Sequence, residues 1–218
     1  MLERWIDTGP LVVRLGQILL PGCLWHGDRS RAVVALTFDD GPDPEHTPTL
    51  LDVLARHQVR ATFFWIGWRV RRSPELARRV ISNGHAIGLH GERHQSWLAR
   101  GADDVLAELE GMRAVLEQEL GLPGPWIARP PFGWVRPSQV RRLSKAGYRV
   151  VECDVLPGDW ATPANVVVER VARQARNGSI VALHDGNTAG PQVAETADHI
   201  ITHLGKRGFG FVTVGELA

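Results

Sequence analysis

Two acids and two histidines have the residue types and the spacing to hold a metal ion. Asp39 and Asp40 are adjacent in the segment 37–42 (TFDDGP), and His90 and His94 are four residues apart. If the chain turns helically after His90, both imidazoles lie on one face within reach of one ion. A carboxylate of Asp40 would complete three ligands and leave open positions for water and substrate, as in catalytic rather than structural zinc sites.

The two adjacent acids are expected to take different roles. Successive side chains of a strand point to opposite faces, but the break at Gly41-Pro42 lets Asp39 and Asp40 both face the site. One carboxylate can then bind the metal while the other acts as a base.

Three more polar segments each follow a predicted strand: 129–133 (RPPFG), 159–160 (DW) and 184–186 (HDG). Loops after parallel strands converge at one rim of an α/β domain, so these segments should meet the acids and histidines there. Taken singly, each motif has an ordinary interpretation: DDGP as a turn, RPPFG as a rigid loop, and His184 as a hydrogen-bonded core histidine. It is their ordered combination that indicates a site.

A second histidine pair shows how little the spacing alone proves. His199 and His203 are also four residues apart, but they lie in a predicted outer helix. We interpret them as a solvated or packed helix face, away from the rim.

Short apolar runs alternate with helical patterns along the chain. Strands are predicted over residues 33–39, 61–67, 85–90, 126–129, 149–154, 179–184 and 209–214, and helices over 47–57, 74–82, 102–120, 137–146, 163–177 and 192–204. The runs 33–36 (VVAL) and 180–183 (IVAL) are apolar on both faces, as a parallel sheet under covering helices requires. An α/β barrel or an open doubly wound sheet follows.

The composition favours one large domain with no nucleic-acid partner. The chain has 218 residues, and its 25 basic side chains nearly balance its 24 acidic ones, so it lacks the cationic surface that nucleic acid requires. The two cysteines, Cys23 and Cys153, are too few for a disulfide framework and are expected to be buried thiols.

Residues 1–30 form a separate N-terminal segment in this interpretation. Leu11, Leu15, Ile18 and Leu19 keep a helical spacing, which predicts an amphipathic helix packed on the domain; a peripheral membrane contact is the alternative. The apolar stretch is shorter than the roughly 20 residues that span a bilayer, and no basic leader precedes it. We therefore expect an intracellular enzyme, or a secreted or envelope enzyme trimmed of its export signal.

The motifs together resemble those of the polysaccharide deacetylases of carbohydrate esterase family four. All five motifs occur in order between residues 37 and 185. The resemblance implies a distorted barrel of seven parallel strands with outer helices, here residues 31–218. It also implies a metal-dependent hydrolase that removes N-acetyl groups from an amino-sugar glycan.

The resemblance assigns a role to each motif residue. It implies that Asp40, His90 and His94 bind the metal and that Asp39 is the catalytic base, held by Arg129. It implies that His184 is the catalytic acid, oriented by Asp159. The substrate would contact Pro131, Phe132 and Trp160, with a backbone amide beside Phe132 facing the oxyanion and Trp160 forming a groove wall.

The cofactor and substrate follow from the same resemblance. A divalent metal is expected, zinc first, with cobalt, nickel or manganese as alternatives. The expected substrate is an N-acetylated carbohydrate, either a chitooligosaccharide or a peptidoglycan-like glycan, and O-acetylated xylan stays open. Protein partners are not indicated.

Two residues depart from the family pattern. Gly91 stands where the family usually has serine or threonine, so a hydroxyl that could brace the metal loop is absent. Leu156 stands where the family has an acid, three residues before Asp159, which predicts a less polar groove wall.

Three other functions remain open at this point. The same barrel could hydrolyse a small cyclic amide or a formamide, or two histidines and one acid could hold iron for oxygen chemistry. From a different class, the chain could be a non-catalytic glycan-binding homologue. The presence of both a base and an acid argues against a pure binding module.

Overall fold

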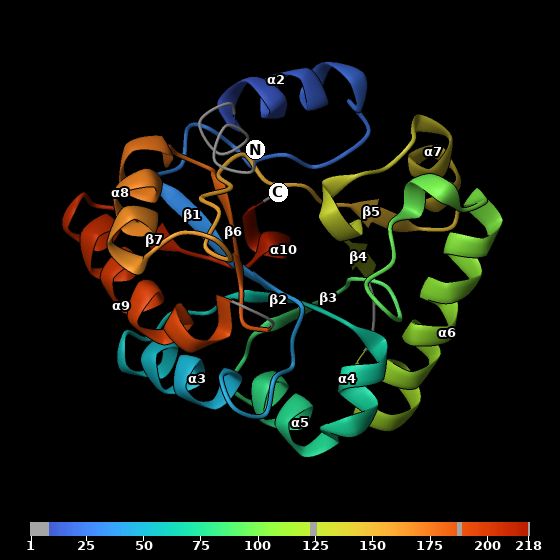
Figure 1. The fold of residues 1–218 in the computed structure, drawn as a ribbon, viewed down its shortest axis with the longest axis horizontal. Coiled ribbons are helices and arrows are strands. Elements are labelled where there is room, and N and C mark those ends of the chain that lie inside the picture. The colour runs from blue at the N-terminus through green and yellow to red at the C-terminus, as the bar shows by residue number, and fades with distance from the viewer. Residues whose placement is uncertain (1–8, 123–125, 187–188, 218) are drawn as a thin grey trace.

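A parallel sheet lies at the centre of the protein and helices surround it. The structure, a computed structural model, describes residues 9–122, 126–186 and 189–217, and Figure 1 shows the helices arranged in a ring around the strands. The strands are β1 (Val33–Asp39), β2 (Thr62–Trp65), β3 (Ala86–Leu89), β4 (Trp126–Ala128), β5 (Tyr148–Val150), β6 (Ile180–His184) and β7 (Gly210–Phe211). The predicted class, a seven-stranded parallel α/β fold with outer helices, is confirmed.

The sheet is a distorted barrel with one irregular seam. Its strand order is β5-β4-β3-β2-β1-β6, and β7 pairs with the first residues of β1; all of these pairs are parallel. Within the described residues, β5 and β6 share no strand ladder. Instead, the chain that leaves β5 reaches β6, where the Val155 N–H donates to the Ile180 carbonyl at 3.2 Å and the Ala182 N–H donates to the Val155 carbonyl at 3.0 Å.

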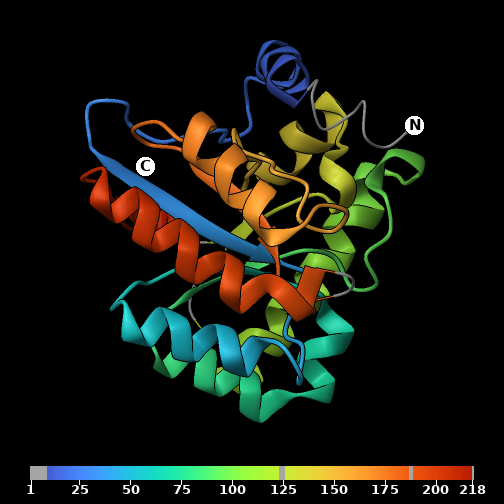
Figure 2. The ribbon, with the colours of Figure 1, turned by 60° about the vertical axis from the view of Figure 1, so that its left-hand side comes forward.

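The outer layer consists of helices between the strands. Their bounds are α2 (Gly9–Leu19), α3 (Thr47–Arg56), α4 (Gly67–Arg72), α5 (Pro74–Ser82), α6 (Ala102–Leu120), α7 (Pro137–Lys145), α8 (Ala164–Gln174), α9 (Gly190–Lys206) and α10 (Val214–Leu217), with 3₁₀ turns η1 (Trp97–Ala99) and η2 (Pro131–Gly133). Figure 2 shows α9 running alongside β1 between α8 and α3, and α9 contacts both helices.

The alternation of side chains along β1 and β6 directs the polar residues into the barrel. Ala35 packs in an inner apolar cluster, whereas its neighbours along β1 pack under the helices: Val34, Leu36 and Phe38. Thr37 and Asp39 follow Ala35 at intervals of two, so they also face the interior. The register pairs Asp39 with His184. The strand period thus brings an acid and a histidine to the same end of the barrel.

The structure differs from the predicted elements at two short helices. The strand predicted over 209–214 is only two residues long, because Glu216 Oε2 accepts from both the N–H and the hydroxyl of Thr213 and thereby starts α10 at Val214. Helix α4 was not predicted. Its six residues begin directly after β2, too short for a periodic pattern, and Gly67 was placed in the strand.

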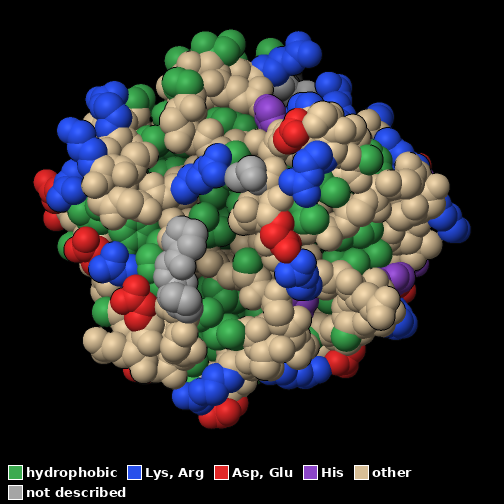
Figure 3. All heavy atoms as spheres, turned by 180° about the vertical axis from the view of Figure 1, so that it is seen from behind, with side chains coloured by type: hydrophobic (Ala, Val, Ile, Leu, Met, Phe, Trp, Pro, Cys, Tyr) green, Lys and Arg blue, Asp and Glu red, His purple; other side chains and the backbone are tan. Residues whose placement is uncertain are grey.

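The N-terminal helix forms where its spacing predicts, but it presents a different face to the domain. Leu11, Leu15, Ile18 and Leu19 are 50–74% exposed, and Figure 3 shows apolar side chains at the edge of the molecule where α2 lies. Gly16 lies against the Trp25 ring, so the helix approaches the domain through its glycine side. The division of the chain at residue 30 stays a prediction. No helix in the described ranges is long and apolar enough to cross a membrane.

Candidate active site

The three predicted metal ligands lie together at the carboxyl ends of β1 and β3. The Nε2 atoms of His94 and His90 lie 3.3 and 3.6 Å from Asp40 Oδ1, and the candidate ligand atoms all lie within 4.8 Å of one another. Asp40 and His90 are buried, and His94 is partly exposed. The two histidines of the predicted pair therefore lie at one candidate site with Asp40.

A backbone contact fixes the orientation of His90. Its Nδ1 lies 2.9 Å from the carbonyl oxygen of Arg129, and because a carbonyl can only accept, Nδ1 must carry the proton. The lone pair of Nε2 then points toward Asp40. Burial lowers the pKa of His90, although the nearby carboxylates of Asp39 and Asp40 oppose this, and the neutral imidazole is the form that binds a metal.

The two histidines meet through an irregular loop and not through the helical turn considered from the sequence. Residues 90–96 form no helix; Gly91 has φ 81° and His94 has φ 51°. The His90 and His94 rings have centroids 5.0 Å apart, and the Phe132 ring packs on His94 with centroids 4.4 Å apart. Asp40 also leaves the extended conformation, with φ 75°, so consecutive acids can both face the site.

Asp39 is held by a buried arginine. Arg129 Nη1 donates to Asp39 Oδ1 and to Thr37 Oγ1, both at 2.7 Å, and Nη2 donates to the Glu152 carbonyl at 3.1 Å. The Arg129 guanidinium also lies 4.1 Å from the centre of the Phe64 ring. Because both partners are buried, this contact fixes the carboxylate of Asp39 in place.

His184 is held by Asp159 in the predicted arrangement. Asp159 Oδ1 accepts from His184 Nδ1 at 2.9 Å, and Oδ2 accepts from the His184 backbone N–H at 2.8 Å. Burial acts to lower the pKa of His184, but the charge and hydrogen bond of Asp159 outweigh it and raise the pKa to about 9. The Trp160 ring meets the His184 ring edge-on, with centroids 5.1 Å apart. His184 is thus a cation at neutral pH and can donate a proton.

The donor set fits a divalent metal. Ligands about 2.1 Å from a tetrahedral zinc ion lie about 3.4 Å from one another, close to the 3.3 and 3.6 Å separations from Asp40 to the two histidines. One carboxylate and two imidazoles also leave coordination positions for water and substrate. Asp40, His90 and His94 would therefore hold the ion, with Asp39 and His184 beside it.

The chain is also similar in sequence to known proteins. Residues 26–151 match the family described as polysaccharide deacetylase. A peptidoglycan-N-acetylglucosamine deacetylase of Bacillus cereus is 37% identical over 198 residues, which cover 88% of this chain and 91% of the relative. The chain belongs to the polysaccharide deacetylase family. It is therefore a carbohydrate deacetylase, a hydrolase, with a candidate site for a divalent metal.

Further relatives extend the similarity. A chitooligosaccharide deacetylase of Bradyrhizobium is 37% identical over 192 residues, covering 81% of this chain and 86% of the relative. The crystal structure of a peptidoglycan N-acetylglucosamine deacetylase superposes with a TM-score of 0.85 at 30% identity, covering 90% of this chain and 92% of that one.

The candidate site includes buried residues that the motifs did not identify as functional. Thr37 and Glu152 both bind Arg129, Thr37 through its hydroxyl and Glu152 through its carbonyl. Burial raises the pKa of the Glu152 carboxyl to about 8, a shift that Arg129 opposes and Asp39 increases. Burial likewise raises the pKa of Asp185 to about 7, and Thr47 Oγ1 donates to this carboxyl at 2.5 Å. Thr37 and Asp185 lie inside motif segments but were given no role, whereas Glu152 lies inside a predicted strand and carried no signal.

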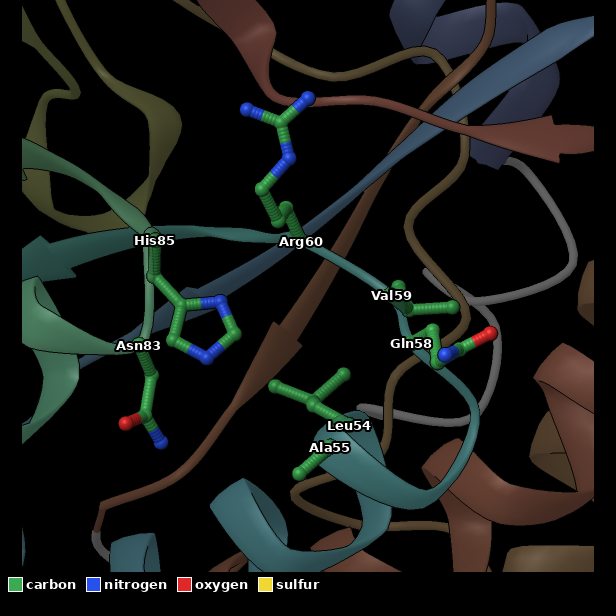
Figure 4. Close-up of a pocket in the computed structure, with 7 residues that line it drawn as sticks. All are labelled: Leu54, Ala55, Gln58, Val59, Arg60, Asn83 and His85. Atoms are coloured by element: carbon green, nitrogen blue, oxygen red, sulfur yellow. The ribbon is translucent and has the colours of Figure 1, made fainter.

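Other histidines, the two cysteines and a surface hollow lie away from this site. His199 and His203 are exposed on α9, as predicted for a helix face, and Cys23 and Cys153 are buried free thiols. Figure 4 shows a hollow at the opposite, amino-terminal ends of β2 and β3, into which His85 and Asn83 point. His85 Nδ1 accepts from the Ala61 N–H at 3.1 Å, and burial lowers its pKa to about 4. This hollow is separate from the candidate site.

Proposed function

We propose that the enzyme removes N-acetyl groups from an amino-sugar glycan, either a chitooligosaccharide or a peptidoglycan-like polymer. The proposal is carried by one observation: the Asp39–Arg129 pair and the His184–Asp159 pair flank the Asp40, His90 and His94 ligand set. A base and an acid on a metal-binding site are the groups that amide hydrolysis requires. Two of the relatives are deacetylases of such glycans.

Zinc is the metal that the donor set favours, and cobalt, nickel or manganese are the alternatives. When bound, a divalent ion would polarise the acetamide carbonyl and lower the pKa of the attacking water. His90 is prepared for this role by its hydrogen bond to the Arg129 carbonyl, which leaves Nε2 unprotonated.

Asp39 acts as the general base in this proposal. Its carboxylate accepts the proton of the attacking water, while the Arg129 guanidinium at 2.7 Å orients the carboxylate. Thr37 binds the same Nη1 atom and restricts the rotation of the guanidinium. The base is therefore supported by neighbours on both sides.

His184 acts as the general acid. An amide does not readily expel an unprotonated nitrogen, so a proton must reach the departing amine. Asp159 holds Nδ1 of His184 and stabilises its cation, so Nε2 carries the proton that is donated. The base is thus held by a cation and the acid by an anion.

The segment 129–133 supplies the remaining substrate contacts. A backbone amide beside Phe132 would donate to the oxyanion, a contribution of about 3 to 4 kcal/mol where such donors have been tested. Phe132 is 62% exposed and Trp160 lies beside His184, so both rings are available as walls for a sugar. Pro131 is buried and supports the turn beneath Phe132.

Acetate release from a substrate panel tests this function. The panel contains chitooligosaccharide, peptidoglycan, O-acetylated xylan and small cyclic amides or formamides, each with zinc-restored enzyme. We expect acetate from the N-acetylated glycans. Turnover of the small amides with no acetate from any glycan would instead support the alternative amide hydrolase, and no turnover at all would support a binding protein.

A further inference from the structure

We propose that Glu108, on helix α6, is the positioning residue that holds the metal-binding loop 90–94 in place of the hydroxyl that Gly91 lacks. The inference rests on the proposed function, because it concerns the same metal site. The only motif residues of this loop are its two histidines, and Glu108 adds a contact to its backbone.

Glu108 reaches the loop from a different part of the fold. Its Oε1 accepts from the backbone N–H of Glu92 at 2.5 Å, and its Oε2 pairs with Arg100. The carboxylate is largely shielded, with 13% of the side chain exposed. A charged acceptor that binds a backbone N–H with little competing water makes a strong hydrogen bond.

Arg100 is itself fixed, so Glu108 has a rigid partner. The Arg100 carbonyl accepts from Gln139 Nε2 at 3.0 Å and from Arg136. Gln139 is fully buried and also donates to the Trp97 carbonyl at 2.7 Å. The anchor thus extends from α7 through Arg100 and Glu108 to the loop.

The conformation of Gly91 explains why a carboxylate from helix α6, and not a side chain at residue 91, holds the loop. Gly91 has φ 81°, which side-chain-bearing residues rarely adopt. A Cβ at this position would lie 3.1 Å from Glu108 Oε1, so the carboxylate lies against the side of residue 91 where a serine or threonine side chain would begin. The absence of a side chain at Gly91 therefore leaves room for the Glu108 carboxylate.

Helix α4 holds the other side of the same peptide segment. The N–H of Gly67 donates to the Gly91 carbonyl at 3.1 Å, and that of Trp68 donates to the Glu92 carbonyl at 3.3 Å. Glu92 also pairs with Arg71 through its side chain. With the carbonyls of Gly91 and Glu92 bound by α4 and the Glu92 N–H bound by Glu108, residue 92 is fixed from two directions.

The constraint matters because His94 is strained. A non-glycine residue at φ 51° keeps this conformation only when its surroundings enforce it, and His94 follows Glu92 by two residues. Release of the Glu92 N–H would let the chain before His94 relax and would change the separation of the two imidazoles. Metal affinity should fall, even though Glu108 does not touch the ion.

Zinc affinity measured on three variants tests this role. Metal-free wild type, Glu108→Ala, Glu108→Gln and the control Glu110→Ala, an exposed acid on the same helix, are titrated with zinc against a chromophoric chelator. We expect Glu108→Ala to bind zinc about 10- to 100-fold more weakly, as for other residues that orient metal ligands. Glu108→Gln should recover most of the affinity, because its amide oxygen can still accept from Glu92. Glu110→Ala should match wild type.

Two further readouts separate positioning from folding and from catalysis. The thermal midpoint of the metal-free Glu108→Ala protein should match that of Glu110→Ala, and its cobalt-loaded form should show an altered absorption spectrum. Unchanged zinc affinity in Glu108→Ala, or equal losses in the alanine and glutamine variants accompanied by a lowered midpoint, would overturn the proposal. The zinc titration uses no substrate, so its outcome does not depend on the proposed function. If the enzyme binds zinc but releases no acetate from the substrate panel, only the proposed function is refuted.

Discussion

Strain at single residues coincides with the candidate site. Among the described residues, Asp40, His94 and Phe132 are three of the four non-glycine residues with positive φ, at 75°, 51° and 63°. Such conformations cost about 1–3 kcal/mol each and persist only where neighbours enforce them. The Asp40 carboxylate and the His94 imidazole meet at the candidate metal site and the Phe132 ring packs on His94, so the strain is tied to the placement of these groups.

The role of Asp39 predicts a sharp loss of turnover without loss of metal. In Asp39→Asn the amide still accepts from Arg129 but no longer takes a proton from water, so the turnover number should fall by about 10²- to 10⁴-fold. Elemental analysis should give the wild-type metal content, since Asp39 is outside the ligand set. Full activity in this variant would remove Asp39 as the base.

The pairing of His184 with Asp159 predicts the alkaline limb of the pH profile. Because the raised pKa of His184 is about 9, the protonated acid is present at neutral pH and is lost as the pH rises through that value. In Asp159→Asn the charge that raises the pKa is gone, burial then dominates, and the limb should move to lower pH. A profile of kcat against pH for both proteins makes the comparison; coincident limbs would contradict the assignment of His184 as the acid.

At the scale of elements, the strands position the residues of the candidate site, whereas the histidine pair on the outer helix α9 has no part in it. The β1–β6 register pairs Asp39 with His184, whereas α9 carries the exposed pair His199 and His203. The double variant His199→Ala/His203→Ala should therefore keep the zinc stoichiometry and turnover of wild type. His90→Ala should lower the bound metal, which makes it the matched comparison; a lower metal content in the α9 variant would show that zinc also binds there.

The stability of the site depends on the core of β6. Leu183 is fully buried next to His184, so Leu183→Ala should destabilise the protein by about 2–5 kcal/mol in denaturant unfolding, because it leaves a cavity. Leu156 is 39% exposed, and Leu156→Ala should change the stability by less than about 0.5 kcal/mol. Similar unfolding free energies for the two variants would mean that β6 is not held by this packing.

Element types were predictable because the apolar periods are strong, but several boundaries were not. Strand β7 ends early because Glu216 caps α10, and α4 is too short to show a helical period. These outcomes depend on single hydrogen bonds and on chain connections that periodicity does not register. The face of α2 that contacts the domain was also not predictable, since it depends on Gly16 fitting the Trp25 ring.

At the scale of the whole molecule, the parallel topology explains why the site could be predicted from the sequence. The carboxyl ends of β1, β3, β4 and β6 lie at one rim, so motifs more than a hundred residues apart were expected to meet there. Asp40 meets His90 and His94, and Asp39 pairs with Arg129 and lies opposite His184. What the sequence did not reveal is how the loops are held. Glu108 and Glu152 act from a helix face and a strand end, where charged residues are common and have no distinctive spacing.

Metal reconstitution tests the central claim most directly. Chelator-treated enzyme is titrated with zinc while bound metal and acetate release from a chitooligosaccharide are measured in the same samples. The account predicts that acetate release rises in proportion to bound zinc and levels off at one ion per chain, and that His94→Ala shows neither rise at the same zinc concentrations. Full acetate release by the metal-free enzyme, or unchanged zinc binding in His94→Ala, would contradict it.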